Sequence, residues 1–336
     1  MGQKRWAISL PFEGFSLAEH VDMAKEAERL GYSDGWSSEV DGVDGFSPLA
    51  AVAHATRMRV GIAIANVYTR GPATLAMTAA GLAEIAQGRF CLGIGAGSQA
   101  IVEYWNGGKF ERATTRVREM VQFLRPALAG ERVVFHGETF SVEGFRISRT
   151  PAQPIPIHVA ALRPPMLRLA GSLADGCIVN WLSAEDVKKS VAVVREAATQ
   201  AGRDPNAVEI TARLFICVDP PSPEAELGIR RHINFYLNVP VYRAFQKWLG
   251  REAVLAPMWT AWDSGDRKGA VAAVPEQVMK DLVLWGSPEE VRAHVRRYLD
   301  AGVDTAFLQF HSFVGDVGQK REAIHQALRE LAPANT

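Results

Sequence analysis

A run of small residues follows an apolar segment, and their types suit the binding of a phosphate or a flat ring. The apolar segment at residues 89–94 leads directly into Gly95, Ala96, Gly97 and Ser98. A parallel strand that ends in glycines and a small hydroxyl residue presents bare backbone N–H groups at its carboxyl end. At such ends α/β proteins bind phosphates and flat cofactors. A tight strand-to-helix turn is the structural alternative.

The same segment argues against a nicotinamide dinucleotide. A G-x-G pattern is weak by itself. The chain also lacks the later glycine and the downstream acidic residue that a dinucleotide-binding unit uses. A Rossmann interpretation is therefore rejected, and the other strand ends become the places to look for ligand-binding residues.

One such strand end precedes a helix that begins with two prolines. Its residues are Ala160, Ala161, Leu162 and Arg163. The N-terminus of a helix is a natural seat for a phosphate, and an arginine there can add a charge-assisted contact. The alternative is an ordinary proline-started helix with an exposed arginine.

A third strand end combines small residues with one branched side chain, in the order Ala63, Ile64, Ala65 and Asn66. Small neighbours would let a bulge push the backbone and the branched side chain toward a ligand. The alternative is a simple loop.

Carboxylates and one histidine also follow predicted strands. Glu39 comes after the second strand, with Asp41 and Asp44 close behind it. A carboxylate in this position can act as a general acid or hold the polar edge of a ring, although acidic residues are also common in solvated loops. Glu13 after the first strand and His311 after the last are isolated candidates, for which a structural role is the alternative.

These residues must be positioned by an alternation of apolar strands and amphipathic helices that runs almost from end to end. The pattern predicts strands at residues 6–10, 33–37, 59–64, 90–94, 157–160, 176–179, 208–218 and 305–310. It predicts helices at residues 17–30, 48–56, 72–87, 112–128, 164–172, 184–201, 287–301 and 316–331, the second with Ser47 as its N-cap. Extended pieces at residues 132–134, 138–142 and 145–147 suggest a hairpin, and the aromatic-rich residues 220–280 suggest a helical insertion.

Eight strand–helix units predict an α/β fold of the (β/α)8 TIM-barrel type, as a single domain over residues 1–336 with the insertion after strand 7. A doubly wound sheet is the main competitor, but it usually stops at about five to seven strands in ~200 residues. Active sites of such barrels lie at the carboxyl ends of the strands, where all the candidates above fall.

Composition limits the partners of this domain. Lys and Arg together number 37, as do Asp and Glu, so the formal net charge is zero. This balance predicts a small-molecule substrate and argues against nucleic acid or a membrane surface. No apolar window reaches the ~18 residues of a membrane span. The N-terminal segment has no signal-type apolar region, and the three cysteines lie in apolar segments without metal-ligand spacing, so we expect a cytoplasmic protein that binds no metal.

The candidate residues do not form any of the common motifs by which protein side chains or bound metals carry out catalysis. No Ser/His/Asp order, no H-E-x-x-H motif and no cluster of metal-type ligands is visible. The carboxyl-terminal end of the predicted barrel, which we call its mouth, is apolar and aromatic. Such a site suits a flat conjugated cofactor whose own ring does the chemistry, while the protein orients the ring and excludes water.

The strand ends taken together resemble the luciferase-like flavin-dependent oxidoreductase superfamily, and especially its branch that uses the deazaflavin coenzyme F420. Methylenetetrahydromethanopterin reductase and the F420-dependent glucose-6-phosphate and alcohol dehydrogenases belong to that branch. The resemblance covers about nine tenths of the chain and is carried by an ordered set of segments, at residues 36–39, 46–50, 66–73, 88–98, 156–161, 166–171, 174–176, 286–291 and 301–304.

The resemblance implies a barrel that is commonly dimeric and holds its cofactor at the strand ends. It implies a non-prolyl cis peptide at Ala63–Ile64 behind the deazaflavin ring. It places the cofactor phosphate on the amides of Ala161, Leu162 and Arg163, and the ring and ribityl chain along residues 95–98. Asn180 and Trp181 would lie close by at the end of strand 6.

The chain departs from the family pattern at two positions. Several members carry an Asp-His pair where this chain has Glu39 and Val40, so a histidine proton donor is absent there. Members that reduce methylenetetrahydromethanopterin have a Glu at the end of strand 1, where this chain has Ser9 or Leu10. Both changes argue against transferring those specific activities.

The leading hypothesis is an F420-dependent oxidoreductase that moves a hydride between the deazaflavin and a small organic substrate over Ile64. Glu39 is its candidate catalytic residue, as a polar partner or proton carrier. An FMN-dependent monooxygenase on the same barrel is the alternative, and a barrel that binds F420 without turnover is a second alternative. A phosphosugar aldolase or isomerase is less favoured, since no lysine lies at a predicted strand end.

Overall fold

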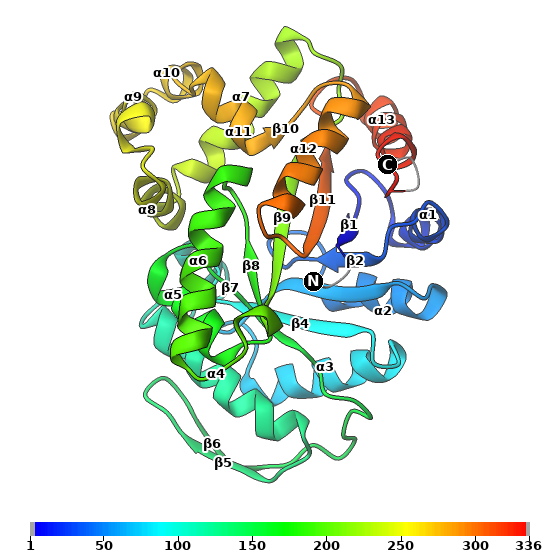
Figure 1. The fold of residues 1–336 in the computed structure, drawn as a ribbon, viewed down its shortest axis with the longest axis vertical. Coiled ribbons are helices and arrows are strands. Elements are labelled where there is room, and N and C mark those ends of the chain that lie inside the picture. The colour runs from blue at the N-terminus through cyan, green and yellow to red at the C-terminus, as the bar shows by residue number, and fades with distance from the viewer. Residues whose placement is uncertain (1–3, 334–336) are drawn as a thin grey trace.

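Eight parallel strands form a closed barrel in the computed structural model, which describes residues 4–333 (Figure 1). The first three residues of the N-terminal segment discussed above lie outside the described range. The strands follow one another around the barrel in chain order, and β8 pairs with β9 to close it. They are β1 (Arg5–Leu10), β2 (Asp34–Ser37), β3 (Arg59–Asn66), β4 (Phe90–Gly95), β7 (Ile157–Ala160), β8 (Gly176–Val179), β9 (Glu209–Cys217) and β11 (Thr305–His311). The predicted (β/α)8 fold is confirmed.

Helices connect the strands and cover the outside of the barrel. They are α1 (Leu17–Arg29), α2 (Phe46–Ala55), α3 (Pro72–Ile85), α4 (Ala113–Leu128), α5 (Pro164–Leu173), α6 (Ala184–Gln200), α12 (Pro288–Asp300) and α13 (Val317–Glu330), with a short 3-10 turn η2 (Pro205–Ala207). Ser16, Ser183 and Ser287 each cap a helix in a reciprocal capping box, which explains the sharp starts of α1, α6 and α12.

The helical insertion follows the seventh barrel strand, as predicted. It comprises α7 (Pro223–Leu237), α8 (Pro240–Leu249), α9 (Glu252–Asp263), α10 (Arg267–Ala272) and α11 (Glu276–Leu282), and ends in the short strand β10 (Val283–Leu284), which pairs with β9 outside the closed barrel. Its apolar side chains form a cluster of their own that includes Trp181 and Phe215 from the barrel. The insertion therefore packs over the ends of β8 and β9.

Three local details differ from the sequence prediction. Helix α2 begins at Phe46, so Ser47 is not its N-cap; the Asp44 carboxylate accepts from the amides of both residues and starts the helix earlier. The three extended pieces form one hairpin of two strands, β5 (Val133–His136) and β6 (Ser141–Phe145), at the opposite end of the molecule from the insertion (Figure 1). Residues Ala100–Trp105 form an unpredicted π-helix, η1.

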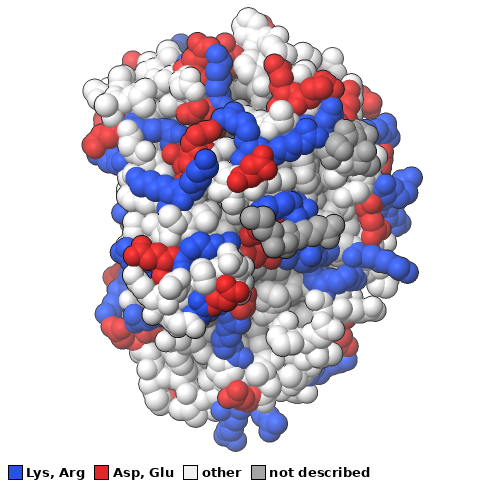
Figure 2. All heavy atoms as spheres, viewed as in Figure 1, with Lys and Arg blue, Asp and Glu red and all other residues white. Residues whose placement is uncertain are grey.

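Charged side chains of both signs are interspersed on the face drawn in Figure 2. Among the described residues, no helix is long and apolar enough to cross a membrane. Both observations agree with the balanced composition of the chain.

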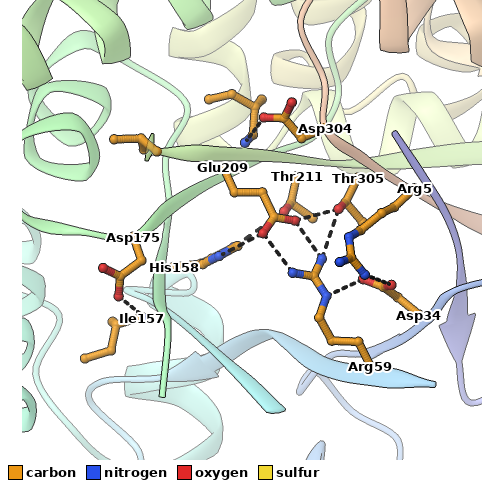
Figure 3. Close-up of polar contacts among 12 residues, drawn as sticks. Arg5, Asp34, Arg59, Ile157, His158, Asp175, Glu209, Thr211, Asp304 and Thr305 are labelled. Atoms are coloured by element: carbon orange, nitrogen blue, oxygen red, sulfur yellow. Dashed lines mark hydrogen bonds and ion pairs between the residues drawn. The ribbon is translucent and has the colours of Figure 1, made fainter. Parts of the chain in front are cut away.

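The amino-terminal end of the barrel interior holds a fully paired polar network (Figure 3). Arg59 donates to Asp34 at 2.6 Å and makes two bonds to Glu209 at 2.6 and 2.8 Å. Thr305 donates to Glu209, and the His158 ring lies 3.7 Å from the same carboxylate. Burial raises the pKa of Glu209, but the hydrogen bonds and charge of Arg59, with His158 and Thr305, outweigh it and lower that pKa to about 2. This network ties together five barrel strands, β2, β3, β7, β9 and β11.

A packed aromatic layer lies above the network. The Trp36 side chain is fully buried, and its ring stacks on Phe307 with 5.7 Å between centroids. A Cβ atom on Gly61 would lie 2.6 Å from the Trp36 ring, so the glycine makes room for the indole. The barrel interior is thus closed below its carboxyl-terminal mouth.

Candidate active site

Small residues gather at the carboxyl ends of four neighbouring strands, β3, β4, β7 and β8. These strands are hydrogen-bonded in that order, so one half of the barrel mouth contains all the residues predicted to bind a cofactor. They are Ala63, Ile64, Ala65, Asn66, Gly95, Ala96, Gly97, Ser98, Ala160, Ala161, Leu162, Arg163, Asn180 and Trp181. We call this half of the mouth the small-residue half.

Ile64 lies at the centre of the small-residue half. The Ala63–Ile64 peptide is cis, as the resemblance implied, and the register of β3 against β4 shifts between Ile62 and Ala65, as the predicted bulge requires. A Cβ atom on Gly95 would lie 3.2 Å from both Ile64 and the Ala160 methyl group. Glycine on β4 therefore leaves space for the branched side chain beside a flat apolar surface.

Asn66 and Gly97 meet beside this surface. Gly97 has a φ of +68°, and a Cβ atom there would lie 2.2 Å from Asn66 Nδ2. The amide of Asn66 is held in place because its Oδ1 accepts from the backbone N–H of Tyr68 at 2.8 Å. Its Nδ2 is buried and has no partner among the described residues, so it remains as a donor for a ligand.

Helix α5 begins at Pro164, and residues 161–163 connect it to the end of β7. The Ala161 amide donates to Ile178 O at 2.9 Å, so one of the three amides predicted to hold a phosphate already has a partner. Within residues 4–333, the amides of Leu162 and Arg163 have no backbone or side-chain acceptor, and the Arg163 side chain is exposed. Two free amides at a helix N-terminus suit an anion.

The end of β8 contacts the insertion. Asn180 donates to the Tyr242 hydroxyl at 3.3 Å, and the Trp181 carbonyl accepts from Gln246 at 2.6 Å. The Trp181 ring stacks on Phe215 with 4.1 Å between centroids, and its buried Nε1 has no partner in the described part of the chain. The predicted pair is therefore fixed by the insertion, with one indole donor unused.

Glu39, the predicted catalytic residue, lies on the other half of the mouth and is already engaged. Arg70 donates to both carboxylate oxygens through Nε, at 3.0 and 3.1 Å, and Gly45 N–H donates at 3.2 Å. Glu39 and Arg70 line a cavity of about 420 Å³ together with Asn66. The geometry places a paired carboxylate beside the small-residue half; its catalytic role stays a prediction.

Arg213 spans the barrel from β9 to β3. Its side chain is buried and donates from Nη2 to the Ala63 carbonyl at 2.7 Å, and it lies 5.4 Å from the Phe307 ring centroid. Burial lowers the pKa of this guanidinium, and Tyr236 and Tyr242 of the insertion partly offset that decrease. No carboxylate lies within ion-pair distance of it among the described residues, so a buried positive charge sits under the small-residue half.

Glu13 and His311, isolated in the sequence, are neighbours in the structure. His311 Nδ1 lies 3.4 Å from Glu13 Oε2, and this hydrogen bond is the main reason why the pKa of Glu13 is lowered. On its other side the His311 ring faces His232 of α7, with 4.5 Å between centroids. Burial lowers the pKa of His232 to about 3, reinforced by His311 and Arg213, so His232 is neutral at neutral pH.

A second cavity, of about 500 Å³, opens beside these residues. It lies between the ends of β1 and β11 and the start of α1, and it shares Gly42 and Val43 with the Glu39 cavity. Three phenylalanines, Phe12, Phe15 and Phe310, contribute to its walls. Its polar lining comes from Ser9, Glu13, Ser16, His20, Gln309 and His311.

Unsatisfied polar atoms are concentrated at this end of the barrel. Seven of the nine buried side-chain atoms that lack a partner in residues 4–333 belong to the mouth and its cavities: His20 Nδ1 and Nε2, Asn66 Nδ2, Trp181 Nε1, His232 Nε2, Gln309 Oε1 and His311 Nε2. Buried polar groups are normally hydrogen-bonded, so such a concentration marks a place where a ligand supplies the partners.

Sequence reasoning missed Arg213, His232 and Gln309. A signal for Arg213 was present, because it is a charged residue inside an otherwise apolar strand. His232 gave no local signal, since its partner is 79 positions away along the chain. The described residues contain no group of three or more His, Cys, Asp or Glu that could hold a metal ion.

Comparison with known proteins places the chain among flavin and deazaflavin enzymes. The family described as luciferase-like monooxygenase matches residues 4–305. The chain is 29% identical to the 5,10-methylenetetrahydromethanopterin reductase of Methanolobus tindarius, over 83% of this chain and 86% of that protein. It is also 29% identical to the F420-dependent glucose-6-phosphate dehydrogenase 2 of Rhodococcus jostii, over 96% and 94% of the two chains.

The fold is shared with a solved F420 enzyme. The structure of the coenzyme F420-dependent tetrahydromethanopterin reductase from Methanopyrus kandleri superposes with a TM-score of 0.81 at 22% identity, covering 99% of this chain and 98% of that one. At this identity the similarity establishes the barrel fold.

Proposed function

This chain belongs to the luciferase-like monooxygenase family, and we propose that it is a coenzyme F420-dependent oxidoreductase that moves a hydride between the deazaflavin and a small organic substrate. The observation that carries this proposal is the small-residue half of the mouth, with its flat surface at Ile64 and unused donors around it. The F420-dependent relatives support the choice of cofactor.

The residues present fit a deazaflavin ring and its phosphate. Ile64, Gly95 and Ala160 offer an apolar face without side chains that would block a ring. Asn66 Nδ2 and Trp181 Nε1 are buried donors that ring or ribityl oxygens would satisfy. The free amides of Leu162 and Arg163 suit the phosphate, and the exposed guanidinium beside them adds a positive charge.

The chemistry is divided between cofactor and protein. A bound deazaflavin supplies C5, which accepts or gives the hydride. Ile64 would support the ring on one of its faces, and the substrate would then approach the other. Helix α7 and its neighbours cover the mouth beside Trp181 and Phe215, which keeps water from the reacting atoms. Glu39, held by Arg70, is proposed as the polar partner of the substrate at the edge of this site.

A parallel fluorescence titration of the purified protein with F420 and with FMN tests the cofactor. We expect tight binding of F420 and weak binding of FMN. A preference for FMN would overturn the proposal in favour of the alternative, an oxygen-dependent monooxygenase on the same fold. Tight F420 binding without hydride exchange to any acceptor would instead indicate the second alternative, a binding protein without turnover.

The variant Glu39→Gln tests the role of the carboxylate. We expect turnover to fall about 100-fold while F420 affinity stays within about twofold, because Glu39 is proposed to contact the substrate and not the cofactor. The measurement is steady-state turnover beside the fluorescence titration. Unchanged turnover would remove Glu39 from the mechanism.

We also propose that the protein works as a cytoplasmic homodimer without a nucleic-acid partner. The three cysteines are buried and free, which suits a reducing compartment. The balanced charge supports the absence of a nucleic-acid partner. Light scattering of the purified protein tests the dimer, and a mass equal to one chain would contradict it.

A further inference from the structure

The two halves of the mouth differ in chemistry. The small-residue half, on β3, β4, β7 and β8, carries the residues suited to the cofactor. The titratable residues Glu13 and His311 lie at the ends of β1 and β11, which belong to the opposite half. A ligand bound between the halves would have the cofactor on one side and the histidine on the other.

His311 has the contacts of a proton carrier. Its Nδ1 lies 3.4 Å from the Glu13 carboxylate, so with Nδ1 donating to Glu13 the free nitrogen is Nε2. That Nε2 is buried and has no partner among residues 4–333. The ring packs near Phe215 and Phe313, with centroid distances of 6.1 and 5.9 Å and nearly parallel planes. A ring fixed in position, with Nδ1 hydrogen-bonded to Glu13 and Nε2 without a partner, is suited to proton exchange.

The charged and titratable groups around His311 come from four elements. Glu13 faces it from the β1–α1 loop, with Lys320 of α13 attracting the same carboxylate. His232 of α7 faces the other side of the ring, and Arg213 of β9 lies close enough to repel a proton on His232. Since His232 stays neutral, it places no positive charge against the His311 ring.

The cavity beside His311 indicates the type of substrate. Its lining includes one carboxylate and contains no lysine or arginine among the described residues. An anion such as a sugar phosphate would find no cationic partner there, whereas the three phenylalanines suit an apolar body. The unsatisfied His311 Nε2 would accept from a substrate hydroxyl or, when protonated, donate to a carbonyl oxygen.

We propose that His311, oriented by Glu13, exchanges the proton of the substrate oxygen, and that the substrate is an uncharged alcohol or ketone with an apolar body bound in this cavity. This inference rests on the proposed F420-dependent hydride transfer. It supplies a proton carrier in a chain that lacks the family's histidine after strand 2.

The step balances as an alcohol oxidation. The carbinol C–H bond breaks, and its hydrogen leaves with two electrons as a hydride for C5 of the deazaflavin, which is thereby reduced. The O–H bond breaks, its proton goes to Nε2 of His311, and the C–O bond becomes C=O. In the reverse direction His311 donates the proton to the ketone oxygen.

The experiment compares the full-length protein with three variants, His311→Gln, Glu13→Gln and His54→Gln. His54 is an exposed histidine on α2 and serves as the matched control. F420 affinity is measured first by fluorescence. Reduction of F420 is then followed with 2-propanol, cyclohexanol, 1-phenylethanol and glucose 6-phosphate, as a function of pH.

We expect His311→Gln to keep F420 affinity within about twofold and to lose about 100-fold in kcat with the neutral alcohols, together with the histidine-dependent limb of the pH profile. Glu13 is a positioning residue, so Glu13→Gln should lose about tenfold in kcat and move that limb to lower pH, because a neighbouring carboxylate favours the protonated ring. His54→Gln should match the unmodified protein. If His311→Gln is poorly folded, His311→Asn and the pH shift of Glu13→Gln carry the test.

The outcomes separate this inference from the proposed function. Failure of the unmodified protein to bind F420 overturns the proposed function before any substrate is added. Wild-type turnover and an unchanged pH profile in His311→Gln overturn the proton carrier. Reduction of F420 by glucose 6-phosphate instead of the neutral alcohols, or by none of the panel, overturns the assigned substrate class.

Discussion

The two ends of the barrel interior use polar residues in opposite ways. At the amino-terminal end, Arg59, Asp34 and Glu209 satisfy one another inside the protein. At the carboxyl-terminal mouth, Asn66, Trp181 and His311 each keep a buried polar atom without a partner in the described chain. Both ends are buried, so burial alone does not separate them.

The two ends differ in whether the protein itself or a bound ligand supplies the hydrogen-bond partners of the buried polar groups. A buried polar group without a hydrogen bond costs about 1–3 kcal/mol, so several of them in one region are a considerable cost to folding. The network at the amino-terminal end avoids this cost and serves stability. The residues at the mouth accept this cost, and a bound ligand would recover it by supplying the missing hydrogen bonds. Barrel enzymes place their active sites at this end of the barrel.

The largest effect is expected at the paired end, from Arg59→Ala. Asp34 is fully buried, and removal of the arginine leaves it only Arg5 at 3.2 Å, while Glu209 loses both of its bonds to the guanidinium. Breaking a buried ion pair from one side costs about 3–5 kcal/mol, so the free energy of unfolding should fall by that amount in urea denaturation. F420 affinity of the folded protein should hardly change.

Arg57→Ala is the matched control for this prediction. Arg57 is an exposed arginine two residues earlier in the chain, and its loss should change the free energy of unfolding by less than about 0.5 kcal/mol. If Arg59→Ala were as stable as Arg57→Ala, the network would not be the stabilising feature described above.

The second expected effect is a loss of stability in mild acid. Burial, the main cause, lowers the pKa of His158 to about 4, whereas in the unfolded chain it titrates near its ordinary value. The unfolded state therefore binds the proton first, and stability present above pH ~6.5 is lost as the pH falls toward about 4. By pH 5 the loss from this residue is about 2 kcal/mol.

Unfolding of the protein in urea at neutral pH and near pH 5 measures this slope. His158→Gln should flatten it by about that 2 kcal/mol, while the exposed His54→Gln should leave it unchanged. The Glu209 carboxylate, whose pKa is lowered to about 2, adds its own loss only below its ordinary value near 4.5. An equal slope in His158→Gln and the unmodified protein would contradict the assignment.

The sequence predicted the small-residue half of the mouth better than the opposite half. Each glycine or small residue at the ends of β3, β4 and β7 makes room for a neighbouring strand end. Such a run of small residues can be recognised directly in the sequence. The pairing of Glu13 with His311 and the reach of Arg213 to Ala63 depend on closure of the barrel. No spacing along the chain encodes such contacts.

The fold itself was predictable because it depends on repetition. Eight apolar strands alternating with capped helices specify the barrel even where single boundaries are wrong. The start of α2 was misjudged because Asp44, rather than Ser47, provides the oxygen that caps the first amides. Glu39 was identified from the sequence as a carboxylate at a strand end. Its partner Arg70 is 31 positions away along the chain, so no local sequence pattern indicated the ion pair.

The smallest expected effect separates ligand binding from stability within the mouth. Gly97→Ala places a methyl group 2.2 Å from Asn66 Nδ2, on a backbone with a φ of +68°. The left-handed backbone costs an alanine about 1–2 kcal/mol, and the displaced amide should lower F420 affinity about tenfold. Gly107→Ala is the matched control, because its φ of +64° imposes the same strain while no atom lies within 4 Å of the new methyl group. Both variants should therefore lose stability in urea, Gly97→Ala the more because its methyl group also displaces Asn66, and only Gly97→Ala should bind F420 more weakly by fluorescence titration. Equal F420 affinity in the two variants would mean that the unpaired amide of Asn66 does not meet the cofactor.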